Sequence, residues 1–265
     1  MKIANFRTAL QLFFFTLLTY GGRIGLKLGH ALPCFSCPYI SGCAGQCYLM
    51  ALQNSIWGLE MPAATIFTSR GVEALLMFAG FLLLALLLGK IWCGWICPFG
   101  TLQDWISTLR RKLEIRESKW KWLQSDRLKP VKYIFLALLL IVPLLIAHIG
   151  LHDDFSLPFC QICPAKSIMP LFAGRTDYFS IDTTNSITIF MTSLLMVLTA
   201  IFLVGMFFKD RFFCIFCPML AIISIFDRVG FVRFHKNVKT CNGCANCQRI
   251  CPMDIRSVHM ETSQP

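Results

Sequence analysis

The sequence predicts an all-α membrane protein, with four transmembrane helices arranged as two parallel repeats and a small cysteine-rich segment near the C-terminal end. Three observations lead to this fold class. Hydrophobic residues make up 56% of the 265 residues and charged residues make up 15%. In soluble domains about a quarter of all residues are charged. Four long apolar stretches divide the chain, and a Cys-Pro motif follows each of them.

Each apolar stretch is long enough to cross a bilayer, which takes roughly 20 residues. The four are Ile3–Gly22, Gly71–Gly89, Val131–Gly150 and Ser186–Phe208. The first follows Lys2 and contains Arg7, as a signal peptide would. No small-residue cleavage site follows it, so we expect it to remain as a span.

Lysine and arginine are distributed unevenly between the loops, and this orients the spans. Residues 90–132 carry ten of these side chains and the part from residue 209 onward carries eight, while the two loops on the other side carry few. We therefore expect a multi-pass protein of a prokaryotic inner membrane, embedded in the lipid bilayer with both termini cytoplasmic. The formal charge of +11 is then explained by the basic residues of the cytoplasmic loops, and nucleic-acid binding is not expected.

Cys-Pro motifs recur at corresponding positions of two halves, in the same order and orientation. An outer pair follows the first and third stretches, and an inner pair follows the second and fourth. The outer pairs are Cys34 with Cys37 and Cys160 with Cys163; the inner pairs are Cys93 with Cys97 and Cys214 with Cys217. This divides the chain into a first membrane repeat (residues 1–125), a second membrane repeat (126–234) and a cytoplasmic cluster loop (235–265).

Two further helices are expected directly after the inner motifs. Residues 101–115 have apolar side chains at helical spacing with basic residues opposite, and residues 220–234 are their counterpart. The apolar face of the first is formed by Leu102, Trp105, Ile106, Leu109 and Leu113. Such patterns are typical of amphipathic helices lying on a membrane surface, here the inner leaflet.

The C-terminal segment contains a run with the spacing Cys-x2-Cys-x2-Cys-x3-Cys-Pro. Its members are Cys241, Cys244, Cys247 and Cys251. In this ferredoxin-like arrangement three close cysteines bind one iron–sulfur cluster and the fourth ligates another. A structural zinc site is instead usually built from two pairs of ligands. The run therefore needs partner cysteines from elsewhere in the chain.

The inner pairs can supply those partners. Together with the C-terminal run they give eight cysteines, enough for two [4Fe–4S] clusters on the cytoplasmic side. We expect Cys217 or Cys97 to complete the first cluster, and Cys251 to join the remaining three. The alternative is that the inner pairs are redox-active thiols and that one cluster forms.

Six cysteines are expected on the outer side: Cys34, Cys37, Cys43, Cys47, Cys160 and Cys163. In an oxidising compartment they could form three disulfides. They could also ligate a third cluster, as the repeat suggests, or form a thiol–disulfide or metal-handling site. The three readings stay open at this point.

The spans contain no cysteine near their midpoints. Electron transfer through this chain alone would therefore have to cross most of the bilayer without an intermediate centre. The histidines near the outer edge are His30, His148 and His152, and none lies at the midpoint of a span. Haem is therefore not expected.

The motif WCGWICPFGTLQDW, followed by a second Cys-Pro motif and the C-terminal run, resembles the NapH- and NosR-type polytopic membrane ferredoxins. The resemblance implies membrane electron transfer with the quinone pool and a partner reductase. Two features differ from the family pattern. Cys214 and Cys217 are one residue closer than the usual Cys-x3-Cys, and one ferredoxin run is present where the family has two.

We therefore expect a membrane-bound iron–sulfur protein that passes electrons between a quinone or cytoplasmic donor and a partner redox subunit or soluble carrier. It would be an electron-transfer subunit of an oxidoreductase complex rather than a stand-alone enzyme. The alternative is a membrane assembly or metal-handling factor that uses its cysteine pairs for thiol–disulfide exchange or metal reduction.

Overall fold

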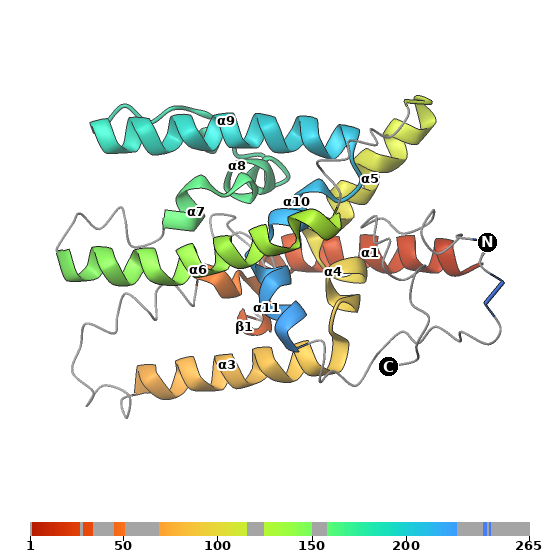
Figure 1. The fold of residues 1–265 in the computed structure, drawn as a ribbon, viewed down its shortest axis with the longest axis horizontal. Coiled ribbons are helices and arrows are strands. Elements are labelled where there is room, and N and C mark those ends of the chain that lie inside the picture. The colour runs from red at the N-terminus through yellow and green to blue at the C-terminus, as the bar shows by residue number, and fades with distance from the viewer. Residues whose placement is uncertain are drawn as a thin grey trace.

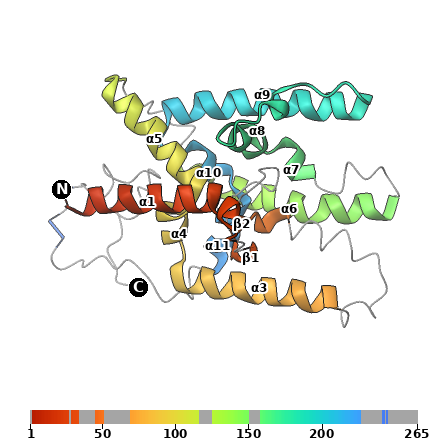
Figure 2. The same cartoon turned by 180° about the vertical axis from the view of Figure 1, so that it is seen from behind.

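The computed structural model describes residues 2–26, 29–33, 45–50, 69–115, 125–149, 158–226, 241–242 and 244. The described chain is mostly helical, as expected (Figure 1). Four long helices have roughly parallel axes in Figures 1 and 2, and their chain directions alternate: α1 (Lys2–Tyr20), α3 (Ser69–Leu88), α6 (Ser125–Ile149) and α9 (Ser186–Phe208). Each coincides with one of the four apolar stretches to within a few residues.

Among the described residues, α9 is the one helix that is both long and apolar enough to cross a membrane, with 23 residues and a mean hydropathy of 2.5. Shorter apolar segments lie in α3 and α6, at Phe78–Leu88 and Pro130–Val142. The four helices are thus confirmed as helices, while the arrangement of four spans in two repeats stays a prediction.

Short helices fill the space between the long ones. In chain order they are α4 (Ile91–Trp95), α5 (Pro98–Lys112), α7 (Pro158–Ile162), α8 (Pro164–Leu171), α10 (Phe212–Phe216) and α11 (Pro218–Phe226). α7 and α8 pack along α9, α10 packs on α6 and α9, and α11 packs on α6 and α3. Figure 1 shows α8, α10 and α11 turned back into the middle of the molecule.

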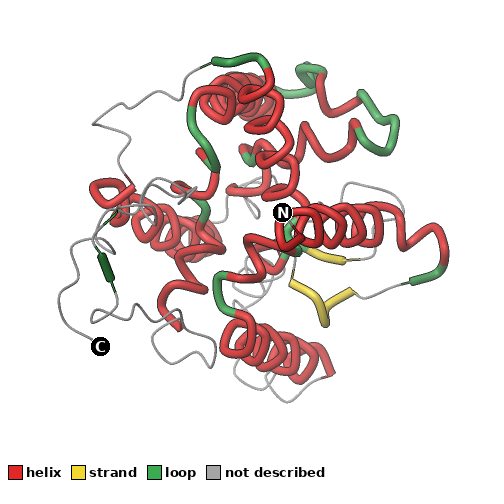
Figure 3. Tube along the Cα trace, turned by 90° about the vertical axis from the view of Figure 1, so that its right-hand side faces the viewer, coloured by secondary structure: helices red, strands yellow, loops and turns green. Residues whose placement is uncertain are grey.

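Two 3-10 turns and one pair of short strands complete the described structure. The turns are η1 (Gly21–Ile24) and η6 (Asp177–Phe179), and the strands are β1 (Gly29–Pro33) and β2 (Gly45–Gln46). The strands pair in parallel, with Gly29 opposite Gly45 and Pro33 opposite Gln46. Figure 3, viewed nearly along the long helices, shows them beside the helical bundle. The all-α prediction did not contain this ladder.

One buried cluster joins the two halves. Side chains from every long helix reach it, among them Phe15 of α1, Phe81 of α3, Leu139 of α6 and Met206 of α9. The short helices contribute its centre, where Phe99, Met169 and Ala221 are at most 1% exposed. Side chains at this depth are held at the packing density of an organic crystal, so the short helices are fixed relative to the long ones.

The outward faces of the long helices are apolar. Exposed apolar side chains recur at helical spacing, one stripe per helix: Leu76, Leu83 and Leu87 on α3, Ile134, Leu138 and Ile141 on α6, and Val197, Ile201 and Val204 on α9. Soluble monomers rarely expose apolar surface on this scale.

The helices after the inner motifs do not lie as expected. α11 was predicted to be interfacial, but Ala221, Ile222 and Ile223 are all buried in the core. The described part of α11 has little polar surface to turn toward water, which explains its burial. On α5 the predicted apolar face is only partly covered, since Leu109 and Leu113 are exposed, and Arg110 on the other side is buried.

Candidate metal centre

Three of the four Cys-Pro motifs share one local structure. In each, the first cysteine is the third residue of a five-residue helix: Cys93 in α4, Cys160 in α7 and Cys214 in α10. The second cysteine directly precedes a helix that begins with proline. We call this arrangement the Cys-Pro unit. The fourth motif, Cys34 with Cys37, lies outside the described residues.

Proline fixes the backbone of the second cysteine. Cys97, Cys163 and Cys217 have ψ angles of 119°, 124° and 117°. A residue before proline is pushed out of the α region by contact with the proline ring, so the first helix must stop there. The chain therefore turns at each second cysteine in the same way.

The spacing difference between the inner motifs leaves this unit intact. The extra residue of the first motif, Ile96, lies between the end of α4 and Cys97. In the second motif α10 ends at Phe216 and Cys217 follows at once. The departure from the usual Cys-x3-Cys spacing thus changes a single turn residue, and both cysteines keep their places.

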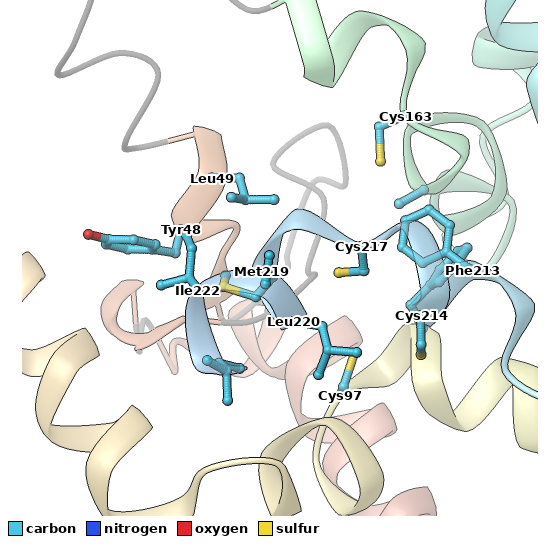
Figure 4. Packing of buried hydrophobic residues seen from close by; sticks show 14 of the residues in the cluster. Tyr48, Leu49, Cys97, Cys163, Phe213, Cys214, Cys217, Met219, Leu220 and Ile222 are labelled. Carbon is cyan, nitrogen blue, oxygen red and sulfur yellow. The ribbon is translucent and has the colours of Figure 1, made fainter. Parts of the chain in front are cut away.

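The inner cysteines of the two halves lie in one place. Cys97, Cys214 and Cys217 belong to the same buried cluster, and Cys93 packs against it (Figure 4). Burial raises the pKa of Cys217, and the neighbouring thiolates of Cys214, Cys93 and Cys97 raise it further. Four sulfurs from four different chain positions are therefore close enough to interact electrostatically.

The side chains available at the inner site are thiols. Within the described part of the chain, no three Cys, His, Asp or Glu side chains converge as the ligands of one metal ion would. An iron–sulfur cluster distributes its four cysteines over several iron atoms, so its ligands surround a volume rather than a point. The four inner cysteines provide the thiol groups that such a cluster uses as ligands.

Gln103 of α5 connects the two inner motifs. Its Oε1 accepts a hydrogen bond from the backbone N–H of Phe213 at 3.0 Å, and its Nε2 lies 3.5 Å from Cys214 Sγ as a donor. The side chain is fully buried. A first-half amide thus donates toward a second-half sulfur.

Arg211 of the second half makes a second connection, to residues of the first half. Its Nε and Nη2 donate to both carboxylate oxygens of Asp104 at 3.0 and 2.8 Å. Nη1 donates to the carbonyl of Cys93 at 3.2 Å, and Nη2 to that of Gly94 at 3.3 Å. Asp104 is further bound by Arg7 and Gln11 of α1. The guanidinium is buried and also lowers the pKa of Cys214, against the larger effect of burial.

Arg211 adopts an unfavourable backbone conformation in this position. Its φ of 52° falls in the left-handed region, which non-glycine residues seldom occupy. Strain of this kind persists where surrounding contacts determine the conformation. Here the contacts are the four hydrogen bonds of the guanidinium.

Sequence reasoning missed Gln103, Asp104 and Arg211. Asp104 is the sole acidic residue of α5, and Arg211 stands three residues before a predicted ligand. An acidic residue within an otherwise basic helix was the available clue.

The second-half outer pair lies deeper than the sequence suggested. Cys160 and Cys163 are buried, and Cys163 belongs to the same cluster as the inner cysteines. Cys47 of the first half also packs against this cluster. No disulfide joins these three described cysteines to one another. Cys43, like Cys34 and Cys37, is outside the described residues.

The C-terminal run is described at two positions. Cys241 and Cys244 are exposed, and the backbone N–H of Cys244 donates to Asn242 Oδ1 at 3.4 Å. Cys247 and Cys251 lie outside the described residues. The assignment of these four cysteines as ligands therefore stays a prediction.

Comparison with known proteins points to iron–sulfur chemistry. A family described as a 4Fe-4S binding domain matches residues 71–116 and 190–239. The first segment contains α3, α4 and Cys93 with Cys97, and the second contains Cys214 with Cys217. The two matched segments thus carry the inner motif of each half.

Several curated proteins are similar over most of the chain. A putative electron transport protein of Escherichia coli, YccM, is 26% identical over 208 residues, covering 78% of this chain and 52% of YccM. The regulatory protein NosR of Pseudomonas aeruginosa is 26% identical, over 64% of this chain and 21% of NosR. The ferredoxin-type protein NapH of Haemophilus influenzae is 24% identical, over 63% and 49%.

This chain spans about half the length of YccM and NapH and about a fifth of the length of NosR. No solved structure matches it.

Proposed function

The chain is related to the NapH- and NosR-type iron–sulfur electron-transport proteins, and on this premise we propose that it passes electrons across a membrane surface through [4Fe–4S] clusters. The donor is a quinone or a cytoplasmic carrier, and the acceptor is a partner redox protein. The chain acts as an electron-transfer subunit rather than as a stand-alone enzyme.

The gathering of the inner cysteines from both halves carries this proposal. Cys93, Cys97, Cys214 and Cys217 come from two segments that the 4Fe-4S family matches separately. A bound cluster supplies one-electron oxidation and reduction at nearly fixed geometry. The protein residues hold its iron by thiolate sulfur, exclude water through the surrounding core, and offset its negative charge with Arg211.

The proposed ligand set is the one that the sequence suggests. Cys241, Cys244 and Cys247 take one inner cysteine, Cys217 or Cys97, as their fourth ligand, and Cys251 joins the remaining three. Two clusters would then lie on the cytoplasmic side. The packing of the inner cysteines of both halves in one buried cluster supports sharing of ligands between them.

A multi-pass topology supports this role. The apolar stripes on α3, α6 and α9 are the surface that a lipid-facing helix presents. Two Cys-Pro units in corresponding positions favour the division into residues 1–125 and 126–234. We propose a prokaryotic inner-membrane location, with both termini cytoplasmic.

Thiol–disulfide exchange is less suited to the inner site. A reactive cysteine needs an accessible sulfur with a lowered pKa. Cys214 and Cys217 are buried, and burial raises the pKa of both. This observation favours ligation over the alternative of an assembly or metal-handling factor.

Iron and acid-labile sulfide per chain test the proposal. We expect anaerobically purified full-length protein to contain about eight irons, or about twelve if an outer cluster is present. Cys214→Ser with Cys217→Ser should remove about four or more, because the core ligands of at least one cluster are lost.

Two results would contradict the proposal: four or fewer irons in the unmodified protein, or no loss of iron in the double variant. A Cys241→Ser variant distinguishes the two clusters, because it removes a ligand of the first cluster alone.

A further inference from the structure

The second-half outer motif has the same architecture as the second-half inner motif. In both, the first cysteine is the third residue of a five-residue helix and the second precedes a proline-initiated helix. The φ and ψ angles of Cys163 are −73° and 124°, and those of Cys217 are −67° and 117°. A structure that supports ligands in one motif is therefore repeated in the other.

The two motifs also lie at nearly the same depth along α9. Ser167 of α8 is hydrogen-bonded to Thr199 at 2.8 Å, near the middle of α9. Phe213, beside Cys214, contacts Phe202 of the same helix with ring centroids 5.2 Å apart. Thr199 and Phe202 are three residues apart, a rise of about 4.5 Å. Cys163 accordingly belongs to the same buried cluster as Cys97, Cys214 and Cys217.

We propose that Cys160 and Cys163 are ligands of a further iron–sulfur cluster inside the helical core, in series with the inner cysteines. This proposal rests on the proposed function. One electron at a time passes from a reduced inner cluster to this cluster and then to an oxidised redox protein on the outer side. Each step oxidises one centre and reduces the next by one electron, and no covalent bond changes.

Such a cluster would shorten the distance that an electron has to tunnel between redox centres on the two sides of the bilayer. Tunnelling through a full bilayer is too slow for a single step, whereas a centre buried between α6, α7 and α9 divides the distance. Burial of both sulfurs also protects the cluster from water and oxidants.

The test compares three full-length variants purified anaerobically. Cys160→Ser with Cys163→Ser should lose at least about two irons per chain, the content of the smallest cluster, and retain the paramagnetic signals that depend on Cys214. Ser167→Ala is the matched control, because it removes the hydrogen bond to Thr199 without removing a sulfur. It should retain all iron.

Unchanged iron in the cysteine variant would overturn the proposal, and so would an equal loss in the Ser167→Ala protein, since the loss would then reflect packing. If iron is also unchanged in the Cys214→Ser, Cys217→Ser protein, the proposed function itself fails. The two failures are therefore distinguishable.

A separate observation concerns Arg211 and Gln103, which approach the inner sulfurs from opposite halves. Arg211 is a fixed positive charge that interacts with Cys214 and Cys97, held by Asp104 and two carbonyls. Gln103 directs an N–H at Cys214 Sγ. Charge and hydrogen bonds to sulfur are the main means by which proteins adjust cluster potentials.

We infer that Arg211 and Gln103 are positioning residues that set the reduction potential of the cluster at the inner cysteines. A reduced cluster carries one more negative charge, so a nearby cation and an N–H donor both favour reduction. This inference also rests on the proposed function.

Potentiometric titration of the paramagnetic signals in full-length protein tests it. Arg211→Met should lower the equilibrium constant for reduction about tenfold, which is about 59 mV for one electron. Gln103→Met should also lower the reduction potential, but by less. Arg211→Lys keeps the positive charge, so its reduction potential should lie close to that of the unmodified protein.

Arg110→Met is the matched control. Arg110 is also a buried arginine that joins α5 to the second half, but it pairs with Asp210 at 2.7 Å. Its loss should leave the potential unchanged. Equal potentials in Arg211→Met and unmodified protein, or an equal shift in Arg110→Met, would sink the inference. Absence of any Cys214-dependent signal would instead remove the proposed function on which it rests.

Discussion

Proline is the residue that gives each Cys-Pro unit its shape. At the first position of a helix its missing N–H costs nothing, because that donor has no partner inside the helix. Its ring also bars the preceding cysteine from the helical region. Pro98, Pro164 and Pro218 therefore each start one helix and end another at a defined thiol. A change of proline would free the cysteine backbone even though no ligand atom is touched.

Gly100 is a second residue whose size matters to the centre. A Cβ added there would lie 2.7 Å from the backbone carbonyl of Cys93. Backbone atoms cannot move aside as a flexible side chain can, so Gly100→Ala should destabilise the protein by about 1–3 kcal/mol through overpacking. Denaturant unfolding in detergent, followed by circular dichroism, measures the free energy of unfolding.

Gly80→Ala serves as the control for this prediction. Gly80 lies inside α3, and a Cβ there would meet nothing within 4 Å. Alanine favours helix over glycine by about 1 kcal/mol, so this variant should be neutral or more stable. Equal effects of the two substitutions would refute the steric account of Gly100.

At the scale of elements, the long helices could be predicted from the sequence and the short ones only in part. Apolar length alone located α1, α3, α6 and α9, since a run of about 20 apolar residues has few other ways to satisfy its backbone. The α5 helix was expected from its periodicity over residues 101–115, and it runs from Pro98 to Lys112, three residues earlier at each end.

The orientation of α5 was predicted less well. Periodicity places apolar side chains on one face, but the most buried positions include the polar residues Gln103, Ser107 and Arg110. The partners of Gln103 and Arg110 lie in the second half, at least 100 residues away in sequence, at Phe213 and Asp210. A local pattern carries no information about such partners, so polar burial across the two halves could not be foreseen.

The depth of the Cys160–Cys163 unit could not be predicted from the sequence for a related reason. The sequence shows that a motif follows a span, but not whether the chain then continues outward or turns back between the helices. The turn is decided by tertiary contacts such as that of Ser167 with Thr199. The candidate ligands themselves were identifiable, because cysteine spacing is a local property.

At the scale of the whole molecule, the two halves behave as a single body around one core. Phe15 of α1 contacts both Trp105 of α5 and Phe172, just after α8, with ring centroids 4.9 and 5.2 Å apart. Tyr20 donates a hydrogen bond to the carbonyl of Phe172 at 2.6 Å. The N-terminal helix thus contacts both α5 of the first half and the end of α8 of the second.

Topology is a prediction that belongs to the whole molecule. A reporter enzyme active only outside the cytoplasm should be active when fused after Gly174 and silent when fused after Phe226. The reason is that α9 separates these positions and carries no charged side chain in its 23 residues. A cytoplasmic reporter should give the opposite pattern at both sites. Activity of the same reporter at both positions would contradict a span between them.

The position of the inner cysteines on two halves has a consequence for biosynthesis. While the ribosome has delivered only the first half, Cys93 and Cys97 lack their counterparts and Asp104 lacks Arg211. The site closes when α10 arrives, more than 100 residues later, so a cluster bound as we propose would be loaded only after α10 has been synthesised. Until then Asp104 has Arg7 and Gln11 of α1 as partners but lacks the two hydrogen bonds from Arg211.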